Sequence, residues 1–114
     1  MFIAVYEFEI KHGAEAEFRE AWLEVTKAIY KYCGSFGSRL HTSDNPNVLV
    51  GYAQWPSREQ WEQDHELTDE QYLFFRQKMR DCLVQSKTVY ELEVSDDYLR
   101  SSARWASSIR IDVA

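Results

Sequence analysis

The chain of 114 residues carries 19 acidic and 13 basic side chains, which gives a formal net charge of -6. This length suits one domain, and a hydrophobic content of 45% with 15% aromatic residues excludes a disordered chain, because such a chain buries too little surface to offset its conformational entropy. The acidic balance disfavours binding to nucleic acid and to anionic membrane surfaces, since both repel negative charge.

The first predicted element is a strand over residues 2–10. Hydrophobic side chains occupy every second position of this segment, namely Phe2, Ala4, Tyr6, Phe8 and Ile10. This alternation is typical of a strand with one buried face. The opposite face begins with Ile3 and Val5 and ends with two glutamates, so it is only partly hydrophobic.

A helix over residues 14–33 is predicted after the turn at "KHG". Its hydrophobic residues recur at intervals of three and four, which is the pattern of a helix with one buried stripe. They are Phe18, Ala21, Trp22, Val25, Ala28, Ile29 and Tyr32. Gly34 then provides the stop, because glycine readily adopts the left-handed conformation that ends helices.

The next two runs, "FGSRLHTS" and "VLVGYAQW", predict an antiparallel hairpin around the turn-rich segment "DNPN". Gly51 in the second run is expected to mark a β-bulge. A helix start is predicted at Ser57, which forms a capping box with Gln60, while Pro56 packs on Trp61 as a hydrophobic staple.

A second long helix is predicted to begin at Thr68, which forms a capping box with Gln71. Its hydrophobic stripe consists of Tyr72, Phe75, Met79, Cys82 and Leu83. A last strand over residues 88–94 follows, because "TVYELEV" alternates again. The order strand, helix, strand, strand, helix, strand predicts a ferredoxin-like α+β fold, βαββαβ, with one antiparallel sheet and both main helices on the same face.

The uncovered face of this sheet predicts a homodimer. Hydrophobic residues occur on both sides of three of the strands, which is more than a sheet with one covered face requires. We therefore expect residues 1–94 to form one domain that pairs with a second copy. Residues 95–114 form a C-terminal extension, for which a short strand over residues 109–113 is favoured over a solvated tail.

The location of the protein is predicted from what the sequence lacks. No hydrophobic run approaches the length that spans a bilayer, and the first residues lack the basic segment and cleavage site of a signal peptide. We therefore expect a cytoplasmic protein. Cys33 and Cys82 lie far apart and outside any CxxC pair, so they are interpreted as buried reduced thiols.

The candidate acid–base residues are histidines. Arg39 and His41 lie two residues apart on a predicted strand and face the same way, so together they can hold and deprotonate an acidic phenol or enol. The alternative is a solvated strand face. His65 lies between two carboxylates that favour its protonated form and a proton-carrying role, although an exposed histidine at an acidic helix end has the same pattern.

Other candidates are tyrosines, and a metal site is disfavoured. Tyr6, Tyr52 and Tyr90 can donate hydrogen bonds to a ligand oxygen from the sheet, although strand tyrosines are commonly core residues with a solvated hydroxyl. The three histidines form no HxH or HxxxH pair, so no preformed metal site is expected.

The segments "FIAVYEFEIKHGAEAEFREAWLEV", "GSFGSRLHTS" and "VLVGYAQWPSREQWEQ" resemble the antibiotic biosynthesis monooxygenase (ABM) domain of the dimeric α+β barrel superfamily. The resemblance covers residues 2–94 and rests on the spacing of element types, so it is more informative about fold than about activity. It implies a dimer with facing sheets and a small apolar pocket in each subunit between sheet and helices. Family members include cofactor-independent quinone-forming oxygenases, haem-degrading enzymes and isomerases.

The resemblance also suggests ligand-contacting positions. In haem-degrading members, asparagine, tryptophan and histidine stand at the positions that match Tyr6, Asp64 and Phe74. None of the three is kept, which disfavours haem degradation. Trp55 matches a pocket tryptophan of the quinone-forming members, and we expect Tyr6, Arg39, Tyr52, Trp55 and Phe74 to bind substrate.

Several functions stay open. The first is a cofactor-independent monooxygenase, in which His41 or His65 deprotonates a small aromatic or phenolic compound and the anion reduces dioxygen. An apolar cavity, one base and hydrogen-bond donors suffice for this chemistry. The second is a non-catalytic protein that binds a small ligand in the same cavity, and the third is an isomerase of a small carbonyl compound.

Overall fold

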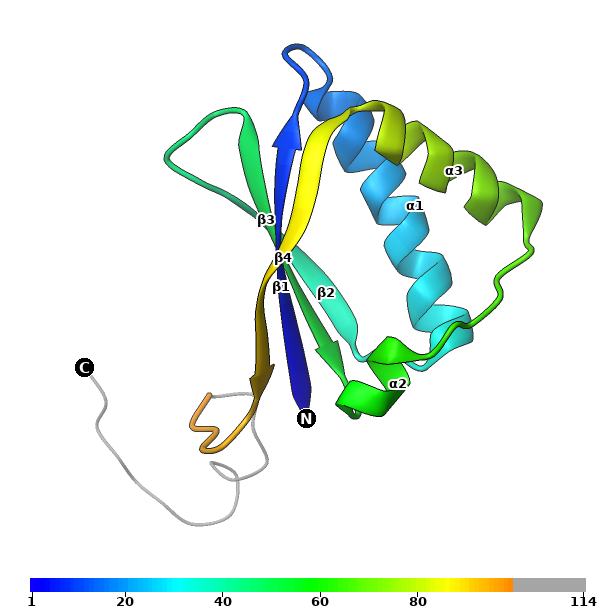
Figure 1. The fold of residues 1–114 in the computed structure, drawn as a ribbon. Coiled ribbons are helices and arrows are strands. Elements are labelled where there is room, and N and C mark those ends of the chain that lie inside the picture. Colours follow the sequence, from blue (N-terminus) through cyan, green and yellow to red (C-terminus); the bar gives the residue numbers. More distant parts are fainter. Residues whose placement is uncertain (100–114) are drawn as a thin grey trace.

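The computed structural model describes residues 1–99, which form a four-stranded antiparallel sheet and three helices. The elements are β1 (Phe2–Ile10), α1 (Glu15–Cys33), β2 (Gly37–Thr42), β3 (Val48–Trp55), α2 (Arg58–Glu62), α3 (Glu70–Asp81) and β4 (Leu83–Glu93). The strand order is β2-β3-β1-β4, and α1 and α3 lie on the same face of the sheet (Figure 1). The predicted ferredoxin-like α+β fold is confirmed.

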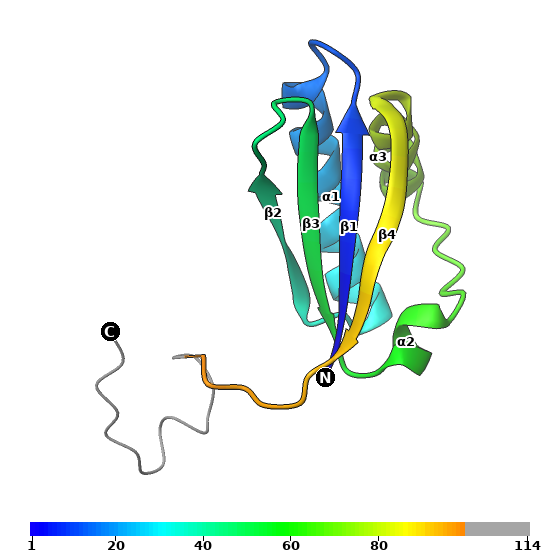
Figure 2. The ribbon, with the colours of Figure 1, turned by 60° about the vertical axis from the view of Figure 1, so that its left-hand side comes forward.

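The helices cover one face of the sheet only. Viewed toward the sheet, the strands lie in front of α1 and α3, with no helix over the near face (Figure 2). Tyr6 and its alternate neighbours on β1 face the helices, while Val5 and Glu7 face the open side. None of the helices described within residues 1–99 is long and apolar enough to cross a membrane.

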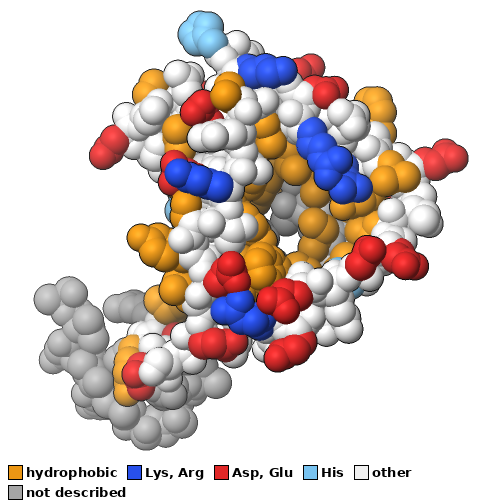
Figure 3. All heavy atoms as spheres, in the orientation of Figure 1, with side chains coloured by type: hydrophobic (Ala, Val, Ile, Leu, Met, Phe, Trp, Pro, Cys, Tyr) orange, Lys and Arg blue, Asp and Glu red, His pale blue; other side chains and the backbone are white. Residues whose placement is uncertain are grey.

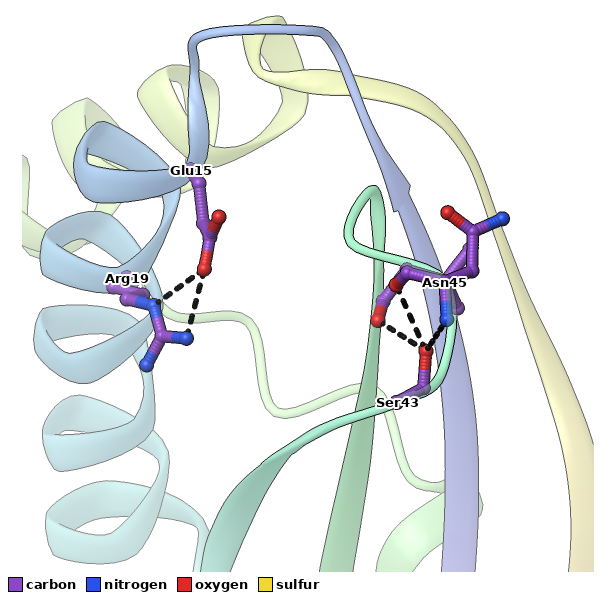
Figure 4. A network of polar contacts seen from close by, with 5 residues as sticks. Glu15, Arg19, Ser43 and Asn45 are labelled. Carbon is purple, nitrogen blue, oxygen red and sulfur yellow. Dashed lines mark hydrogen bonds and ion pairs between the residues drawn. The ribbon is translucent and has the colours of Figure 1, made fainter.

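The β2–β3 hairpin is closed by side chains of its turn. The hydroxyl of Ser43 accepts from the Asn45 backbone N–H at 3.2 Å and lies within hydrogen-bond distance of the Val48 carbonyl oxygen at 2.7 Å. Figure 4 shows this turn in the same view as the first turn of α1, which carries the Glu15–Arg19 ion pair at 2.8 Å. Polar side chains thus replace missing backbone partners in the turn, as Ser and Asn commonly do.

The junction between α1 and α2 is held by Gln60. Gly34 ends α1 with a φ of 77°, as predicted, and the Ser57 hydroxyl accepts from the Gln60 N–H at 3.1 Å to begin α2. The Gln60 side chain does not complete the predicted capping box. It donates instead to the carbonyl oxygen of Cys33 at 2.9 Å, so it caps the end of α1 and fixes the start of α2 against it.

The start of α3 and its C-terminal boundary differ from the prediction. Asp69, not Thr68, is the N-cap, and its carboxylate accepts from the Tyr72 N–H at 2.9 Å. Asp and Thr are both good N-cap residues, and α3 uses the aspartate, which lies one position later. Cys82 ends the helix, and Leu83 already pairs with Ile10 of β1, so β4 starts five residues before the predicted position 88.

The core lies between the sheet and α1. Phe2, Phe18 and Leu49 are the largest fully buried side chains. Helix α3 contributes no buried residue and packs on α1. This arrangement leaves a hollow between the sheet and the two helices, and Figure 3 shows hydrophobic side chains around it.

Gly51 does not mark a bulge, so that prediction is wrong. Strand β3 pairs without interruption through Gly51 with both β1 and β2, and the irregularities lie between β1 and β4 instead. A Cβ atom at Gly51 would lie 2.8 Å from Cε2 of Phe8, which is too close for a real contact. The glycine is therefore required because the Phe8 ring lies directly over the backbone of β3.

The C-terminal extension is described only in part. Residues 94–99 form no helix or strand, and β4 ends at Glu93, close to the predicted domain end at residue 94. The strand predicted over residues 109–113 lies outside the described residues.

We expect Gly51→Ala to lower the free energy of unfolding by about 1–3 kcal/mol, because the added methyl group displaces the Phe8 ring from its packed position. Urea denaturation measures this loss. Phe8→Leu serves as the partner in a double-mutant cycle, since the smaller side chain makes room for the methyl group. The double variant should lose less than the sum of the single variants, and strictly additive losses would contradict the steric explanation.

Candidate functional site

The hollow between the sheet and the helices contains a cavity of about 350 Å³. Its walls come from β1, β3, α1, α2, α3 and the segment that joins α2 to α3. The lining residues are Tyr6, Ile29, Cys33, Trp55, Trp61, Gln63, Asp64, His65, Glu66, Leu67, Tyr72 and Arg76. A volume of this size falls in the range of roughly 300–1,000 Å³ that small-molecule sites commonly have.

A hydrogen bond from Trp61 to Tyr6 crosses one side of this cavity. The indole Nε1–H donates to the Tyr6 hydroxyl at 2.7 Å. Trp61 also packs on Phe2, with ring centroids 5.1 Å apart, and this contact fixes the indole over the end of β1. Tyr6 itself stands at the middle of β1, so the bond connects α2 to the centre of the sheet.

The environment of Tyr6 keeps its hydroxyl protonated. Burial raises the pKa of Tyr6 above the usual 10.0, because a phenolate is poorly solvated in the cavity. The hydrogen bond from Trp61 lowers this pKa in part, and the negative charge of Glu91 raises it again. At neutral pH the hydroxyl is therefore available as a hydrogen-bond donor.

His65 also lines this cavity and lies against Trp55. The two rings are stacked with centroids 5.8 Å apart and an interplanar angle of 19°. Its Nε2 lies 2.9 Å from the carbonyl oxygen of Gln60. A carbonyl can only accept, so Nε2 carries a proton, and in the neutral ring Nδ1 is then free to accept one.

The backbone beside His65 has an uncommon conformation. Glu66 has a φ of +46°, in the left-handed region, and its N–H donates to the Asp64 carboxylate at 3.1 Å. A non-glycine residue in this region is held there by its surroundings. The turn at Glu66 therefore fixes the direction of the chain between His65 and Leu67 along the cavity wall.

A second cavity of about 240 Å³ adjoins the first and shares Tyr6, Ile29 and Trp55 with it. Its wall is mostly apolar, with Phe8, Trp22, Val25 and Met79 among the lining residues. Gly51 also lines it, and the Phe8 ring packs against the backbone at that position. We refer to it as the inner cavity and to the first as the outer cavity.

Arg39 and His41 lie on the open face of the sheet, away from the outer cavity. The Arg39 guanidinium lies 4.8 Å from the centre of the Tyr52 ring, and His41 Nδ1 lies 3.1 Å from the Val50 carbonyl oxygen. Tyr52 belongs to this group, although it also contributes to the wall of the inner cavity. Arg39 and His41 therefore share one face, as predicted, and it is the open face of the sheet.

Phe74 lies on α3 and is 62% exposed. Its ring meets the edge of Phe75 at a centroid distance of 5.1 Å, and it lines neither cavity. The structure therefore brings together Tyr6, Trp55 and His65 of the predicted site residues, and it separates them from Arg39, His41 and Phe74.

Trp61 is the cavity residue that sequence reasoning interpreted differently. The pattern at the start of α2 predicted only that Trp61 packs on Pro56 as a hydrophobic staple. In the structure its indole N–H donates a hydrogen bond to the Tyr6 hydroxyl. The chemistry of tryptophan could have indicated this role, since a half-buried indole N–H needs a hydrogen-bond acceptor. Arg76, from α3, also lines the outer cavity and was not predicted. Within residues 1–99, no three His, Cys, Asp or Glu side chains gather as metal ligands.

Comparison with known proteins identifies related folds. The family model of the antibiotic biosynthesis monooxygenases matches residues 1–71. SnoaB from Streptomyces nogalater, a cofactor-independent oxygenase, superposes with a TM-score of 0.67 at 20% identity, over 84% of this chain and 94% of SnoaB. None of the curated protein sequences matches the chain.

Two further solved structures share the fold. A protein of Bordetella bronchiseptica superposes with a TM-score of 0.69 at 14% identity, covering 82% of this chain and 96% of its own. Rv0793 from Mycobacterium tuberculosis superposes with a TM-score of 0.64 at 18% identity, covering 84% and 96%. At these identities the similarity establishes the fold and leaves the reaction to be argued from the site.

We expect Tyr6 to titrate above pH 10.0, because burial disfavours its ionised form. Carbon-13 NMR of labelled tyrosine rings follows each midpoint, and Tyr6→Phe identifies the resonance. Since folding raises the pKa of Tyr6, the protonated hydroxyl contributes to the free energy of unfolding in full below the pKa of the unfolded chain. This contribution is lost as pH rises through the pKa of the folded protein. A Tyr6 midpoint at or below 10.0 would show that the hydroxyl is more solvated than the structure indicates.

Proposed function

The chain belongs to the antibiotic biosynthesis monooxygenase family, and we propose that it is a cofactor-independent monooxygenase that oxidises a small phenolic compound in the outer and inner cavities. One observation carries the proposal. A hydrogen-bond donor, Tyr6, and a proton acceptor, His65, line the same cavity, whose other walls include the rings of Trp55 and Trp61.

The cavities suit a flat aromatic ligand with a polar edge. The inner cavity offers apolar contacts from Phe8, Trp22 and Met79, where a hydrocarbon ring loses no hydrogen bond on leaving water. The outer cavity offers Tyr6 and His65 to the polar edge. The ligand therefore points its hydrocarbon end inward and its oxygen toward the boundary between the two cavities.

The proposed reaction begins with proton transfer. Nδ1 of His65 takes the proton of the phenol, and the Tyr6 O–H donates to the oxygen that becomes negative. The rings of Trp55 and Trp61 border this site and lower its local polarity, which strengthens that hydrogen bond on the developing charge. The phenolate is electron-rich and transfers an electron to dioxygen.

The remaining steps balance without a further reductant. Superoxide and the phenoxyl radical combine at a ring carbon, and the O–O bond of the peroxide breaks as that carbon loses its hydrogen. One oxygen atom remains as a new carbonyl group. The other leaves as water together with the two hydrogens lost by the substrate, so a phenol and dioxygen give a quinone and water. The cofactor-independent activity named for SnoaB supports this assignment.

The experiment compares the three histidines in turn. Oxygen uptake with 1-naphthol is measured for the wild type and for His65→Gln, His41→Gln and His12→Gln. We expect His65→Gln to lower kcat by about 100-fold or more, because glutamine keeps a hydrogen bond to the Gln60 carbonyl but accepts no proton. His12, in the turn before α1, is the matched control and should retain the wild-type rate.

Two outcomes contradict this proposal. Loss of oxygen uptake in His41→Gln with full activity in His65→Gln would move the base to the open face of the sheet. Tight binding of 1-naphthol with no oxygen uptake by the wild type would favour the non-catalytic binding protein instead.

We also propose that the protein is a homodimer that pairs through the open face of the sheet. Tyr90 and Leu92 are 61% and 45% exposed there. Tyr90 pairs with Val5 of β1, which pairs on its other side with Tyr52 of β3, and Leu92 pairs with Ile3. A contiguous hydrophobic patch of this kind marks an interaction surface, and a two-fold axis buries the same patch on both copies. Arg39, His41 and Tyr52 would then belong to the subunit interface.

We expect Leu92→Glu to convert the dimer to a monomer, because it places a charge in the proposed interface. Leu73→Glu is the matched control, since Leu73 is 42% exposed on α3, on the other side of the molecule. Sedimentation velocity should show a dimer for the wild type and for Leu73→Glu. A monomeric wild type at micromolar concentration would overturn the proposal.

A further inference from the structure

The hydrogen-bonding capacity of the Tyr6 hydroxyl is half used. Trp61 Nε1–H donates to it at 2.7 Å, and an indole N–H can only donate. The hydroxyl oxygen is therefore the acceptor in this bond. Among residues 1–99, Trp61 is the partner found for this hydroxyl, so its own proton has no protein acceptor there.

Trp61 is rigidly placed for this role. Its ring packs on Phe2 at 5.1 Å, and α2 is fixed at its start by Ser57 and by the bond from Gln60 to the end of α1. The Tyr6 ring is held from its other side by Phe8, with centroids 6.0 Å apart and an interplanar angle of 27°.

We propose that Trp61 is a positioning residue that makes the Tyr6 hydroxyl a donor only, so that the cavity selects ligands with an acceptor oxygen at this point. This inference rests on the proposed use of the cavity as a small-molecule site. Ligands of the selected class are aromatic ketones, quinones and phenolates. A ligand that can only donate a hydrogen bond finds no acceptor at Tyr6, because the Tyr6 oxygen already accepts from Trp61.

This selection agrees with the order of steps in the reaction. A phenol gains the Tyr6 hydrogen bond most strongly after it has lost its proton, because charged acceptors form stronger hydrogen bonds than neutral ones. Its proton must therefore go elsewhere, and His65 lines the same cavity. The quinone product keeps an acceptor oxygen at the same place.

The test uses three bicyclic compounds that share a fused five- and six-membered ring skeleton. 1-Indanone carries an acceptor oxygen, indole carries an N–H donor, and indene carries neither. Calorimetry gives their dissociation constants for the full-length wild type, Tyr6→Phe, Trp61→Phe and Trp55→Phe. The ratios between compounds are compared within each variant, so that a general loss of packing or stability cancels.

We expect the wild type to bind 1-indanone about 3- to 10-fold more tightly than indene, and indole no more tightly than indene. Tyr6→Phe should remove the preference for 1-indanone. Trp61→Phe frees the acceptor position of Tyr6, so indole should gain about 3- to 10-fold over indene, because its N–H replaces the lost one. Trp55→Phe, the matched loss of another wall tryptophan, should weaken all three compounds and leave their ratios unchanged.

The outcomes separate this inference from the proposed function. Equal binding of 1-indanone and indene by the wild type, or no gain of indole in Trp61→Phe, overturns the positioning role while the cavity remains a ligand site. Failure of all three compounds to bind overturns the cavity proposal and this inference with it. Should Trp61→Phe not fold, the comparison of wild type with Tyr6→Phe still decides whether Tyr6 selects the acceptor.

Discussion

The outer cavity depends on one hydrogen bond, from the Trp61 indole to the Tyr6 hydroxyl. It joins α2, a helix of five residues with no buried side chain, to β1, one of the two inner strands of the sheet. Without this bond, α2 would be held to the sheet by the Phe2 contact and by the ion pair between Arg58 and Glu91. The bond therefore shapes the cavity wall and also determines what the tyrosine can offer to a ligand.

The second condition for the cavities is that α3 packs on α1 and contributes no buried residue of its own. A helix seated directly on the sheet would fill the space with its own side chains. The fold thus gives up some packing in the region where a ligand would supply the missing contacts.

The order of elements could be predicted because periodicity is a local property, and β1, α1, α3 and the second half of β4 carry a clear repeat. Local rules were less reliable where two neighbouring residues compete, as Thr68 and Asp69 do for the cap of α3. They also missed the first half of β4. The segment "LVQSK" alternates poorly, and it is a strand because it pairs with β1, which a local pattern does not show.

The site was harder to predict because its contacts join distant segments. Arg39 and His41 were correctly assigned to one face, but strand register and helix placement decide which face that is. Trp61 had a sufficient local explanation, while its partner Tyr6 lies 55 residues away in the sequence. A pair of this kind becomes visible only when the helix is placed against the sheet.

The central claim is that a phenol binds between the sheet and the helices, against Tyr6. The most direct measurement is a nitrogen-15 NMR titration with 1-naphthol that follows the indole N–H signals and the backbone amides. The indole signals of Trp22, Trp55 and Trp61 should shift, because these rings line the two cavities. Shifts confined to β2 and the open face around Arg39, with these indole signals unchanged, would contradict the account.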